Sequence, residues 1–255
     1  MIVLFDYDSL IYSSVYRIVD YSKIRSWFEK GKARDWMEKE IVALSINRLE
    51  QMAGNIFQEI EDTGVEISGV EYFITTNKND ARKAKVSTYK AQRKRNKWVS
   101  MVRKYLIEMD FAKSCEVWEA DDLIADRCAE TEVEDRIVLS IDKDMKQIEG
   151  FHFDYWRPRS TYDDQGNRIV HRCRGLSVMT EEDSNMFFWT QMLVGDGADN
   201  IKGVKGIGPK TAEKLLKEEE DLQSIVYNCY DDCYQDGGRA FRDSYFLLKL
   251  GTREL

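Results

Sequence analysis

The sequence predicts an α/β fold, with a parallel sheet covered by helices and a helical part behind it. Three apolar runs of strand length alternate with longer amphipathic stretches, and these runs are residues 2–5, 70–75 and 137–141. Continuous apolar runs are typical of strands buried on both faces, and their alternation with helices favours parallel pairing. After Thr180 the pattern is helical only. We therefore expect a core at residues 1–179 and an all-helical subdomain at residues 180–255.

The helices of the expected core follow from the spacing of apolar residues. Residues 33–62 predict a long amphipathic helix, because apolar residues recur there every three to five positions. They are Met37, Ile41, Leu44, Leu49, Met52, Ile56 and Ile60. A second helix is expected to carry Trp98, Val102, Tyr105, Leu106 and Met109. The acidic cluster at residues 116–122 runs into a third helix.

The second half of the chain predicts a hairpin and then a set of helices. Residues 163–167 are typical of a hairpin turn. Thr180 is a suitable N-cap, and Pro209 suits the first turn of a helix over residues 211–217. Two more amphipathic helices are expected at residues 221–233 and 239–250.

The charges of the chain are unevenly distributed. The net charge of the 255 residues is −8, yet residues 78–104 hold eleven Lys or Arg against a single Asp, or +10. Such asymmetry indicates a polyanion-binding element on an acidic body. A solvated charge run is the alternative interpretation of this stretch.

Composition excludes several classes of protein. No apolar run approaches the ~20 residues that a membrane span needs, and the first residues lack the basic region of a secretory signal. Five scattered cysteines without CxxC spacing fit reduced thiols in a cytoplasmic protein. Only two histidines are present, which argues against histidine-rich metal sites and most Ser-His-Asp catalysis.

Carboxylates stand in four groups where strands or loops end. The groups are Asp6/Asp8, Glu119/Asp121/Asp122, Asp142/Asp144 and Asp196/Asp199. The carboxyl ends of parallel strands form the ligand crevice of such a sheet, so Asp6, Asp142 and Asp144 should converge there. Converging carboxylates repel unless cations neutralise them, and oxygen ligands favour Mg²⁺ or Mn²⁺. For single members, such as Asp8, Asp121 and Asp122, helix capping is the alternative.

A glycine-rich stretch at residues 193–216 is the second informative feature. Gly203, Gly206 and Gly208 free backbone N–H groups in a loop that opens a helix at Pro209. A loop of this kind can cradle a phosphate, with the positive end of the helix dipole favouring the anion. The lysines of the stretch add positive charge, and they are Lys202, Lys205, Lys210 and Lys214.

Taken together, these motifs resemble the 5′-nuclease (flap endonuclease) superfamily, and in particular the small standalone enzymes encoded by bacteriophages. The resembling strings are FDYDSLIY (5–12), TYKAQRK (88–94), EADD (119–122), SIDKDMKQI (140–148) and LVGDGADNIKGVKGIGPKTAEKLL (193–216). The resemblance implies a PIN-like nuclease core, a basic helical arch at about residues 78–104, and a C-terminal helix-three-turn-helix element that grips duplex DNA by its phosphates.

The resemblance also implies a set of metal ligands. Asp6, Glu119 and Asp121 are expected to hold one ion, and Asp142, Asp144 and Asp196 the other. Asp121 would lie between the two ions. Asp122 and Asp199 are expected to act as outer ligands through water. The ions would be Mg²⁺ or Mn²⁺, with a K⁺ ion as a further expectation at the glycine-rich loop.

DNA contacts are expected from two segments. In the arch, Lys90 would face the scissile phosphate and Tyr89 would stack on a base, while Arg82, Lys83 and Arg93 would grip the phosphate backbone. In the glycine-rich stretch the contacts would come from Lys202, Gly203, Lys205, Gly206, Gly208, Lys210 and Thr211.

The implied activity is two-metal hydrolysis of a phosphodiester near a DNA 5′ end, in replication or repair. It would proceed as a 5′-3′ exonuclease or a flap endonuclease, leaving a 5′-phosphate and a 3′-hydroxyl. The expected partner is duplex DNA with a 5′ single-stranded flap, nick or end, with RNA:DNA hybrid as an additional substrate. We expect a monomer, no fused polymerase and no sliding-clamp peptide.

One departure from the family pattern keeps other functions open. Members usually carry an aspartate just after the second strand, where this sequence has Thr76 or Asn77, with Asp80 nearby. Tyr7 also replaces a common glycine. One alternative is a structure-specific DNA-binding protein of the same fold with little or no activity. A PIN-type ribonuclease is another, although the duplex-binding loop argues against it.

Overall fold

The computed structural model describes most of the chain. The described residues are 1–18, 26, 29–30, 34–76, 78, 81–94, 96–155, 159–162, 165, 168–171, 175–217 and 221–251. Within these ranges, no helix combines the length and the apolar character of a membrane span.

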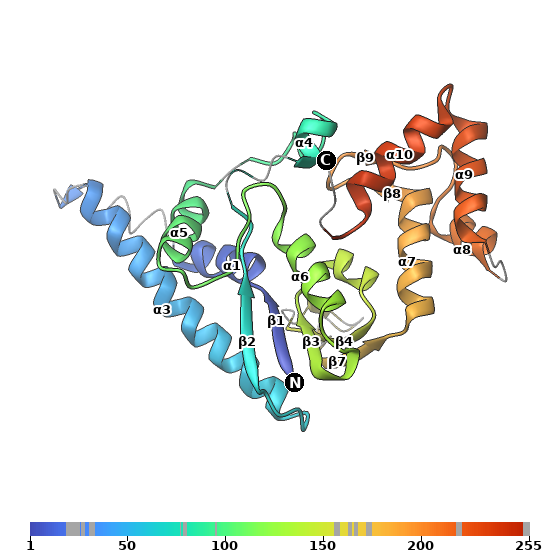
Figure 1. The fold of residues 1–255 in the computed structure, drawn as a ribbon. Helices are drawn as coiled ribbons and strands as arrows, with labels where there is room; N and C mark the ends of the chain where they lie inside the picture. Colours follow the sequence, from blue (N-terminus) through green and yellow to red (C-terminus); the bar gives the residue numbers. More distant parts are fainter. Residues whose placement is uncertain are drawn as a thin grey trace.

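A five-stranded sheet forms the centre of the fold, in the order β2-β1-β3-β4-β7 (Figure 1). Its strands are β1 (Ile2–Asp6), β2 (Gly69–Phe73), β3 (Arg136–Leu139), β4 (Gly150–Asp154) and β7 (Gly175–Met179). The first four strands are parallel. The predicted α/β class is therefore confirmed, and the three expected strands are present. β1 and β3 are almost wholly buried as expected, whereas in the edge strand β2 only Phe73 is buried.

Alternate residues of the central strands pack against different layers of helices. Val3 and Phe5 of β1 share one apolar cluster with three helices, α1 (Asp8–Ile18), α3 (Arg34–Glu61) and α5 (Lys97–Glu108). Leu4 and Val138 instead pack against α6 (Ala120–Ala129). Successive side chains of a strand point to opposite faces, so one apolar run supplies both layers. Burial of each large apolar side chain contributes about 1.5–3 kcal/mol.

The helices after residue 180 enclose an apolar cluster of their own. They are α7 (Glu181–Val194), α8 (Pro209–Leu216), α9 (Leu222–Cys233) and α10 (Gly237–Leu248), which lie across the sheet from α3 (Figure 1). Val86 and Tyr89, from the segment that follows α4 (Ala81–Lys85), also pack in this cluster. The division of the chain at residues 179 and 180 stays a prediction, since the second cluster draws on both parts.

The strands differ from the sequence prediction in three respects. The sheet contains two strands, β4 and β7, that are not among the three expected. β7 runs antiparallel to β4, so the sheet is not wholly parallel. A short antiparallel pair, β8 (Gly195–Asp196) and β9 (Ile201–Lys202), lies in the C-terminal part, so its expected all-helical character is wrong. Two-residue strands are too short to show a period in a sequence, which explains why this pair is not predicted from the sequence.

The predicted hairpin between β4 and β7 is confirmed. Its strands are β5 (Arg159–Tyr162) and β6 (Arg168–His171), which pair antiparallel. The turn residues 163, 164, 166 and 167 lie outside the described part of the chain.

The predicted helices are present, but some bury other side chains than expected. α3 buries Ser45, whereas Leu44 is only half-buried. α5 leaves Tyr105 and Met109 exposed. A helix repeats every 3.6 residues, so its buried stripe passes over some polar residues and misses some apolar ones. In the described ranges the structure also has two 3₁₀ helices, η1 (Val133–Asp135) and η2 (Lys143–Gln147).

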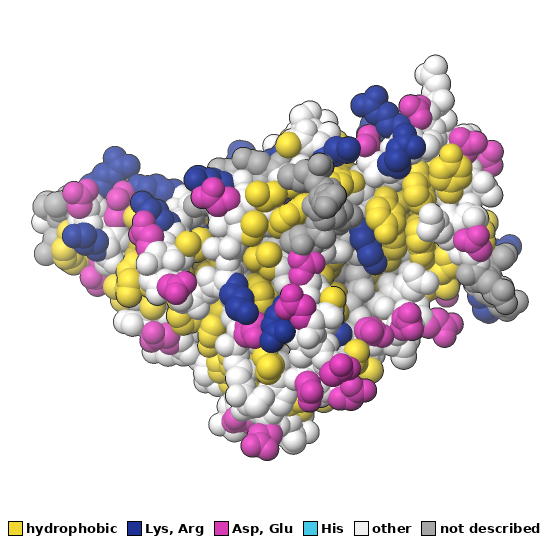
Figure 2. All heavy atoms as spheres, in the orientation of Figure 1, with side chains coloured by type: hydrophobic (Ala, Val, Ile, Leu, Met, Phe, Trp, Pro, Cys, Tyr) yellow, Lys and Arg dark blue, Asp and Glu magenta, His cyan; other side chains and the backbone are white. Residues whose placement is uncertain are grey.

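The surface keeps the charge asymmetry of the sequence. Figure 2 shows Asp and Glu predominating along the lower edge of the face in view, while Lys and Arg lie mostly higher on this face, interspersed with acidic side chains. The basic stretch at residues 78–104 is not one helix, because turns over residues 87–92 separate α4 from α5.

Two glycines let the backbone approach itself closely where α7 ends. Gly195 has a left-handed φ of +76°. A Cβ on Gly203 would lie 2.3 Å from the carbonyl oxygen of Leu193, which already accepts a hydrogen bond from Val204 N at 2.7 Å. Only glycine permits this approach. The crossing fixes β8, which carries Asp196.

We expect Gly203→Ala to lower the free energy of unfolding by about 1–3 kcal/mol, because the new methyl group overlaps fixed backbone atoms. Urea denaturation followed by circular dichroism measures this change. Gly208→Ala is the matched control, since nothing lies within 4 Å of a Cβ at Gly208. Equal stabilities of the two variants would contradict the structural role of Gly203.

Candidate metal centre

The predicted acidic groups meet in one open cavity of about 540 Å³. Among the described residues, eight carboxylates line it: Asp6, Asp8, Glu119, Asp121, Asp142, Asp144, Asp196 and Asp199. The same cavity is lined by six basic side chains of the described chain: Lys83, Lys90, Arg93, Lys94, Arg103 and Lys143. The structure thus brings together groups that are far apart in sequence, from Asp6 to Asp199.

The ends of β1 and β3 position the first carboxylates. Asp6 is the last residue of β1, and its carboxylate accepts a hydrogen bond from Ser140 Oγ at 2.7 Å. Ser140 follows β3, and its Oγ accepts from Asp142 N at 2.9 Å. Asp142 caps η2 by accepting from Asp144 N at 2.9 Å. The expected convergence of Asp6 with Asp142 and Asp144 follows from this parallel pairing.

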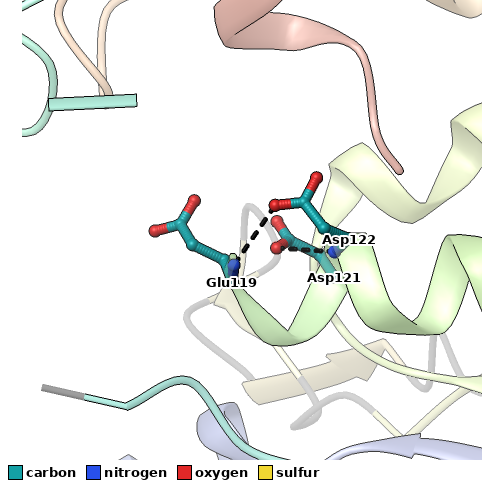
Figure 3. Close-up of side chains that lie close together, drawn as sticks. All are labelled: Glu119, Asp121 and Asp122. Atoms are coloured by element: carbon teal, nitrogen blue, oxygen red, sulfur yellow. Dashed lines mark hydrogen bonds between the residues drawn. The ribbon is translucent and has the colours of Figure 1, made fainter. Parts of the chain in front are cut away.

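The start of α6 supplies a second group of carboxylates (Figure 3). Ligand atoms of Glu119, Asp121 and Asp122 lie within 4.8 Å of one another. Asp122 Oδ2 accepts from Glu119 N at 3.2 Å, and Asp121 Oδ1 accepts from Asp122 N at 3.1 Å, as the dashed lines in Figure 3 mark. These bonds satisfy N–H groups that the first turn of a helix leaves open.

Asp122 and Arg82 lie elsewhere than their expected roles require. The Asp122 side chain is 0% exposed and does not line the cavity. Both its oxygens accept from Arg82, at 2.6 and 2.7 Å. Arg82 itself is 4% exposed, so in this structure it grips a carboxylate rather than offering its charge to DNA. Their roles as outer metal ligand and backbone contact stay predictions that this ion pair does not favour.

The loop after α7 supplies the third group. Ligand atoms of Asp144, Asp196 and Asp199 lie within 4.8 Å of one another. Asp144 accepts from Gln191 Nε2 at 2.7 Å. Asp196 accepts from Ala198 N at 2.8 Å and pairs with Lys143 Nζ at 2.9 Å. The C-terminal part therefore completes a cavity whose other walls belong to the sheet.

The basic segment after α4 is folded onto these carboxylates. Lys90 Nζ lies 2.6 and 2.8 Å from the two oxygens of Glu119 and 3.5 Å from Asp199. Arg93 also pairs with Asp199. Tyr89 is 3% exposed and donates its hydroxyl to Glu119 at 2.7 Å, so its ring offers no free face to a base in this arrangement.

Several carboxylates of the cavity have raised pKa values, as expected for acidic groups that are buried and close together. Burial, with the charge of Asp8, raises the pKa of Asp6 to about 7, and burial with the charge of Asp142 raises the pKa of Asp144 to about 6. Burial and the charge of Glu119 raise the pKa of Asp121 well above its usual range. Each raised pKa marks a negative charge that a bound cation would stabilise.

Glu119 differs because its neighbours are cations. Burial acts to raise its pKa, but the charges of Lys90 and Arg82 outweigh burial and lower the pKa to about 2. Lysine and arginine thus provide part of the positive charge that the acidic cavity needs.

The donor set fits hard divalent cations. All the acidic ligand atoms are carboxylate oxygens, which Mg²⁺ and Mn²⁺ prefer. Two groups, Glu119 with Asp121 and Asp144 with Asp196 and Asp199, each bring their oxygens within the reach of one ion. Asp6 and Asp142 line the same cavity.

The region of the missing aspartate is occupied by Thr76 and Asp8. Thr76 lines the cavity, and its hydroxyl donates to Cys115 O at 3.1 Å. Asp8 Oδ2 accepts from Thr75 N at 3.1 Å, and Asp8 Oδ1 lies 2.8 Å from Arg103 Nε. The carboxylate of Asp8 therefore lies beside the end of β2, where the family usually has an aspartate. Asn77 and Asp80 lie outside the described residues.

Sequence reasoning gave no role to three residues at the site. Lys143 is paired with Asp196, Gln191 holds Asp144, and Arg103 is paired with Asp8. For Lys143 the signal was its position between Asp142 and Asp144. Gln191 and Arg103 carry no such local signal, since their partners are distant in sequence.

The residues of the glycine-rich stretch form a separate surface. Lys205, Lys210 and Thr211 are exposed, and none of the predicted DNA contacts at residues 202–211 lines the acidic cavity. Gly206 has a left-handed φ of +85°, and Gly208 caps α8. Exposed lysines beside a helix N-terminus are compatible with phosphate binding. The DNA contacts of this stretch stay predictions, as does its K⁺ ion.

Comparison with known proteins agrees with these features. Residues 184–244 match the family described as 5′-3′ exonuclease, C-terminal SAM fold. A flap endonuclease Xni of Shewanella sp. (strain W3-18-1) is 28% identical over 159 residues, covering 59% of this chain and 58% of that protein. A DNA polymerase I of Rhizobium leguminosarum is 34% identical over 116 residues, covering 44% of this chain and 10% of the polymerase.

A solved structure extends the similarity to the fold. The bacteriophage T5 flap endonuclease, in a pseudo-enzyme-product complex with DNA and metal ions, superposes with a TM-score of 0.53 at 14% identity. The superposition covers 96% of this chain and 88% of that one. In sequence, parts of this chain are similar to the 5′-3′ exonuclease family and to a flap endonuclease, and in fold the chain is similar to the T5 flap endonuclease.

The 5′-nuclease match has a limited extent in sequence. The chain spans about three fifths of the length of the flap endonuclease that it matches and a tenth of the polymerase. The fold similarity, in contrast, includes both the mostly parallel sheet and the C-terminal helices.

Mn²⁺ binding is expected to tighten as the pH rises from about 5 to about 8. Asp6 and Asp144, with pKa values of about 7 and about 6, are protonated at the acidic end and must lose their protons to ligate a cation. Isothermal titration calorimetry across this range measures the effect, up to about tenfold per pH unit for each proton released. Asp6→Asn should remove the part of this pH dependence that lies nearest neutral pH, because the pKa of Asp6 is about 7. A pH-independent affinity would contradict the ligand assignment.

Proposed function

We propose that this protein is a metal-dependent 5′-nuclease that hydrolyses phosphodiester bonds of DNA at 5′ ends or flaps. The observation that carries the proposal is the cavity in which two groups of carboxylates, able to hold two ions, face the basic Lys90. The names of the relatives, a flap endonuclease and a DNA polymerase I, support the same reaction and substrate. The T5 complex with DNA and metal ions supports it as well.

In this proposal Asp6, Glu119 and Asp121 hold one Mg²⁺ or Mn²⁺ ion. Asp142, Asp144 and Asp196 hold the other. Bound ions of this kind lower the pKa of an attacking water and stabilise charge on the attacking and leaving oxygens.

The chain's own residues orient the substrate and add positive charge. Lys90 is held at the cavity by Glu119, and its ammonium group can move from that carboxylate to a bound phosphate. A cation aimed at the transferring phosphoryl group stabilises the transition state more than the ground state. Exposed lysines of the glycine-rich stretch would grip the duplex, which supplies binding without sequence preference.

The finer parts of the proposal concern metal, substrate and assembly. We infer Mg²⁺ or Mn²⁺ at the carboxylates, K⁺ at the glycine-rich loop and RNA:DNA hybrid as an additional substrate. We further infer a monomer with a core at residues 1–179 and a DNA-binding subdomain at residues 180–255.

A second candidate function is a structure-specific DNA-binding protein with little activity. Two observations favour it. Thr76 stands where the family usually has an aspartate, and the carboxylates are already paired with Lys90, Arg93 and Lys143. This candidate predicts salt-dependent binding to branched duplex without cleavage.

We expect a 5′-labelled flap duplex to be cleaved with Mg²⁺ or Mn²⁺ and to stay intact with EDTA. Asp142→Ala should abolish cleavage, because it removes a proposed metal ligand, while binding to the flap is largely retained. Denaturing gels measure cleavage, and filter binding in a metal that does not support cleavage measures affinity. Cleavage by the variant at the wild-type rate would refute the assignment. Tight binding without cleavage by the wild type, in any metal, would favour the second candidate.

Lys90→Met should separate two effects of one side chain. Cleavage is expected to slow by about 10²–10³-fold, because the cation facing the phosphate is lost. Mn²⁺ affinity is expected to rise, because Glu119 and Asp199 lose a competing cation. Lys39→Met is the matched control, since Lys39 is exposed on α3, outside the basic stretch, and does not line the cavity. Loss of cleavage together with weakened Mn²⁺ binding would show that Lys90 is needed to build the site instead.

A further inference from the structure

A short segment that begins with the last residue of α10 contacts the residues that hold both carboxylate groups. This segment, Leu248–Gly251, is here named the strap. Its contacts to these supports are made by backbone atoms, from four consecutive residues.

The strap makes two sets of hydrogen bonds, here called its arms, and the first arm leads to Asp144. Gln147 Nε2 donates to Leu248 O at 2.8 Å, and Leu250 N donates to Gln147 Oε1 at 3.2 Å. Gln147 Nε2 also donates to Gln191 Oε1 at 3.1 Å. Gln191, which is 6% exposed, donates its own Nε2 to Asp144 Oδ1 at 2.7 Å. An unbroken series of hydrogen bonds thus joins the strap to a proposed metal ligand.

The second arm leads to Glu119. Arg82 Nη2 donates to Lys249 O at 3.2 Å, and Gly251 N donates to Asp122 Oδ1 at 3.1 Å. Arg82 Nη1 donates to Glu119 Oε2 at 3.1 Å. The strap therefore braces the Arg82–Asp122 pair, which in turn orients Glu119.

The two arms alternate along the strap. Residues 248 and 250 serve Gln147, while residues 249 and 251 serve Arg82 and Asp122. Alternation of this kind is what extended backbone produces, and Lys249 has extended dihedral angles of φ −67° and ψ 128°. Gly251 has a left-handed φ of +107°, and its Cβ would lie 3.3 Å from Asp126 Oδ1. The backbone geometry of four residues thus sets the separation of the two arms.

We propose that the strap is a positioning element of the metal centre, and that Gln147 and Arg82 are its positioning residues. This inference rests on the proposed function, because it concerns how the carboxylates are held for two ions. Partners behind a ligand fix its orientation, and their loss commonly lowers metal affinity by about 10–100-fold. Gln147 would fix the orientation of the carboxylate group that contains Asp144, and Arg82 would fix that of the group that contains Glu119. Neither role needs a contact with substrate.

The experiment compares Gln147→Met with the wild type in the full chain. Methionine keeps the length of glutamine but neither donates to Leu248 and Gln191 nor accepts strongly from Leu250. Mn²⁺ is the probe. Calorimetric titration gives the two affinities, and electron paramagnetic resonance gives the magnetic coupling between two bound Mn²⁺ ions. We expect one affinity to fall about tenfold and the coupling to change.

Two further variants complete the design. Gln58→Met is the matched control, because Gln58 lies on α3, donates to the exposed Asp62 and does not line the cavity. Arg82→Lys keeps the positive charge beside Asp122 but cannot reach Glu119 and Lys249 together, so it should weaken the other Mn²⁺ ion. This second variant also keeps the test decisive should Gln147→Met fail to fold.

The outcomes separate the inference from the proposed function. Unchanged affinities and unchanged coupling in both variants, whatever their melting temperatures, would overturn the strap as a positioning element and leave it a structural tether. Wild-type protein that binds no pair of Mn²⁺ ions and leaves a flap duplex intact would overturn the proposed function itself. Binding of two Mn²⁺ ions and cleavage by the wild type, with one ion weakened in Gln147→Met and the other in Arg82→Lys, would support both the strap and the proposed function.

Discussion

Eight carboxylates of the described chain face one cavity, and the rest of the structure is arranged around holding them there. Like charges at such distances repel strongly where burial excludes water, which is why the pKa values of Asp6 and Asp144 are raised. The parallel sheet brings the ends of β1 and β3 together, and α6 and the loop after α7 add their acids from either side. Every one of these elements is positioned by apolar packing elsewhere, so hydrophobic burial provides the energy that opposes the repulsion.

Lysine and arginine supply the compensating charge in this structure. Lys90, Arg93 and Lys143 each pair with an acidic wall of the cavity. Because Tyr89 and Val86 pack among the C-terminal helices, the segment that carries Lys90 is attached to both halves of the molecule. A bound ion would therefore compete with these basic side chains for the same oxygens. The competition gives one physical reason why a basic segment over an acidic cavity can respond both to metal ions and to a phosphate backbone.

The sequence was most informative where a pattern is local and repeated. The strand at residues 2–5, the helix α3 and the N-cap Thr180 follow from apolar period and capping chemistry, and all are present. The elements that the sequence analysis missed are β4, β7, which pairs antiparallel at the sheet edge, and the short β8–β9 pair. Tyr105 and Met109 have the spacing of a buried stripe, yet they are exposed because neighbouring elements cover the Val99 side of α5.

By itself, the sequence determined the fold class, the acidic residues that could meet at the ends of strands, and the resemblance to 5′-nucleases. Those conclusions depend on residue type, spacing and order along the chain. Only the tertiary structure decided that Arg82 and Tyr89 are buried against Glu119 and Asp122, that Gln191 holds Asp144, and that the strap joins the two groups. The physical reason is that burial and hydrogen-bond partnership depend on which distant segments the packed cores bring within about 3 Å of each other. No local pattern of the sequence determines that distance.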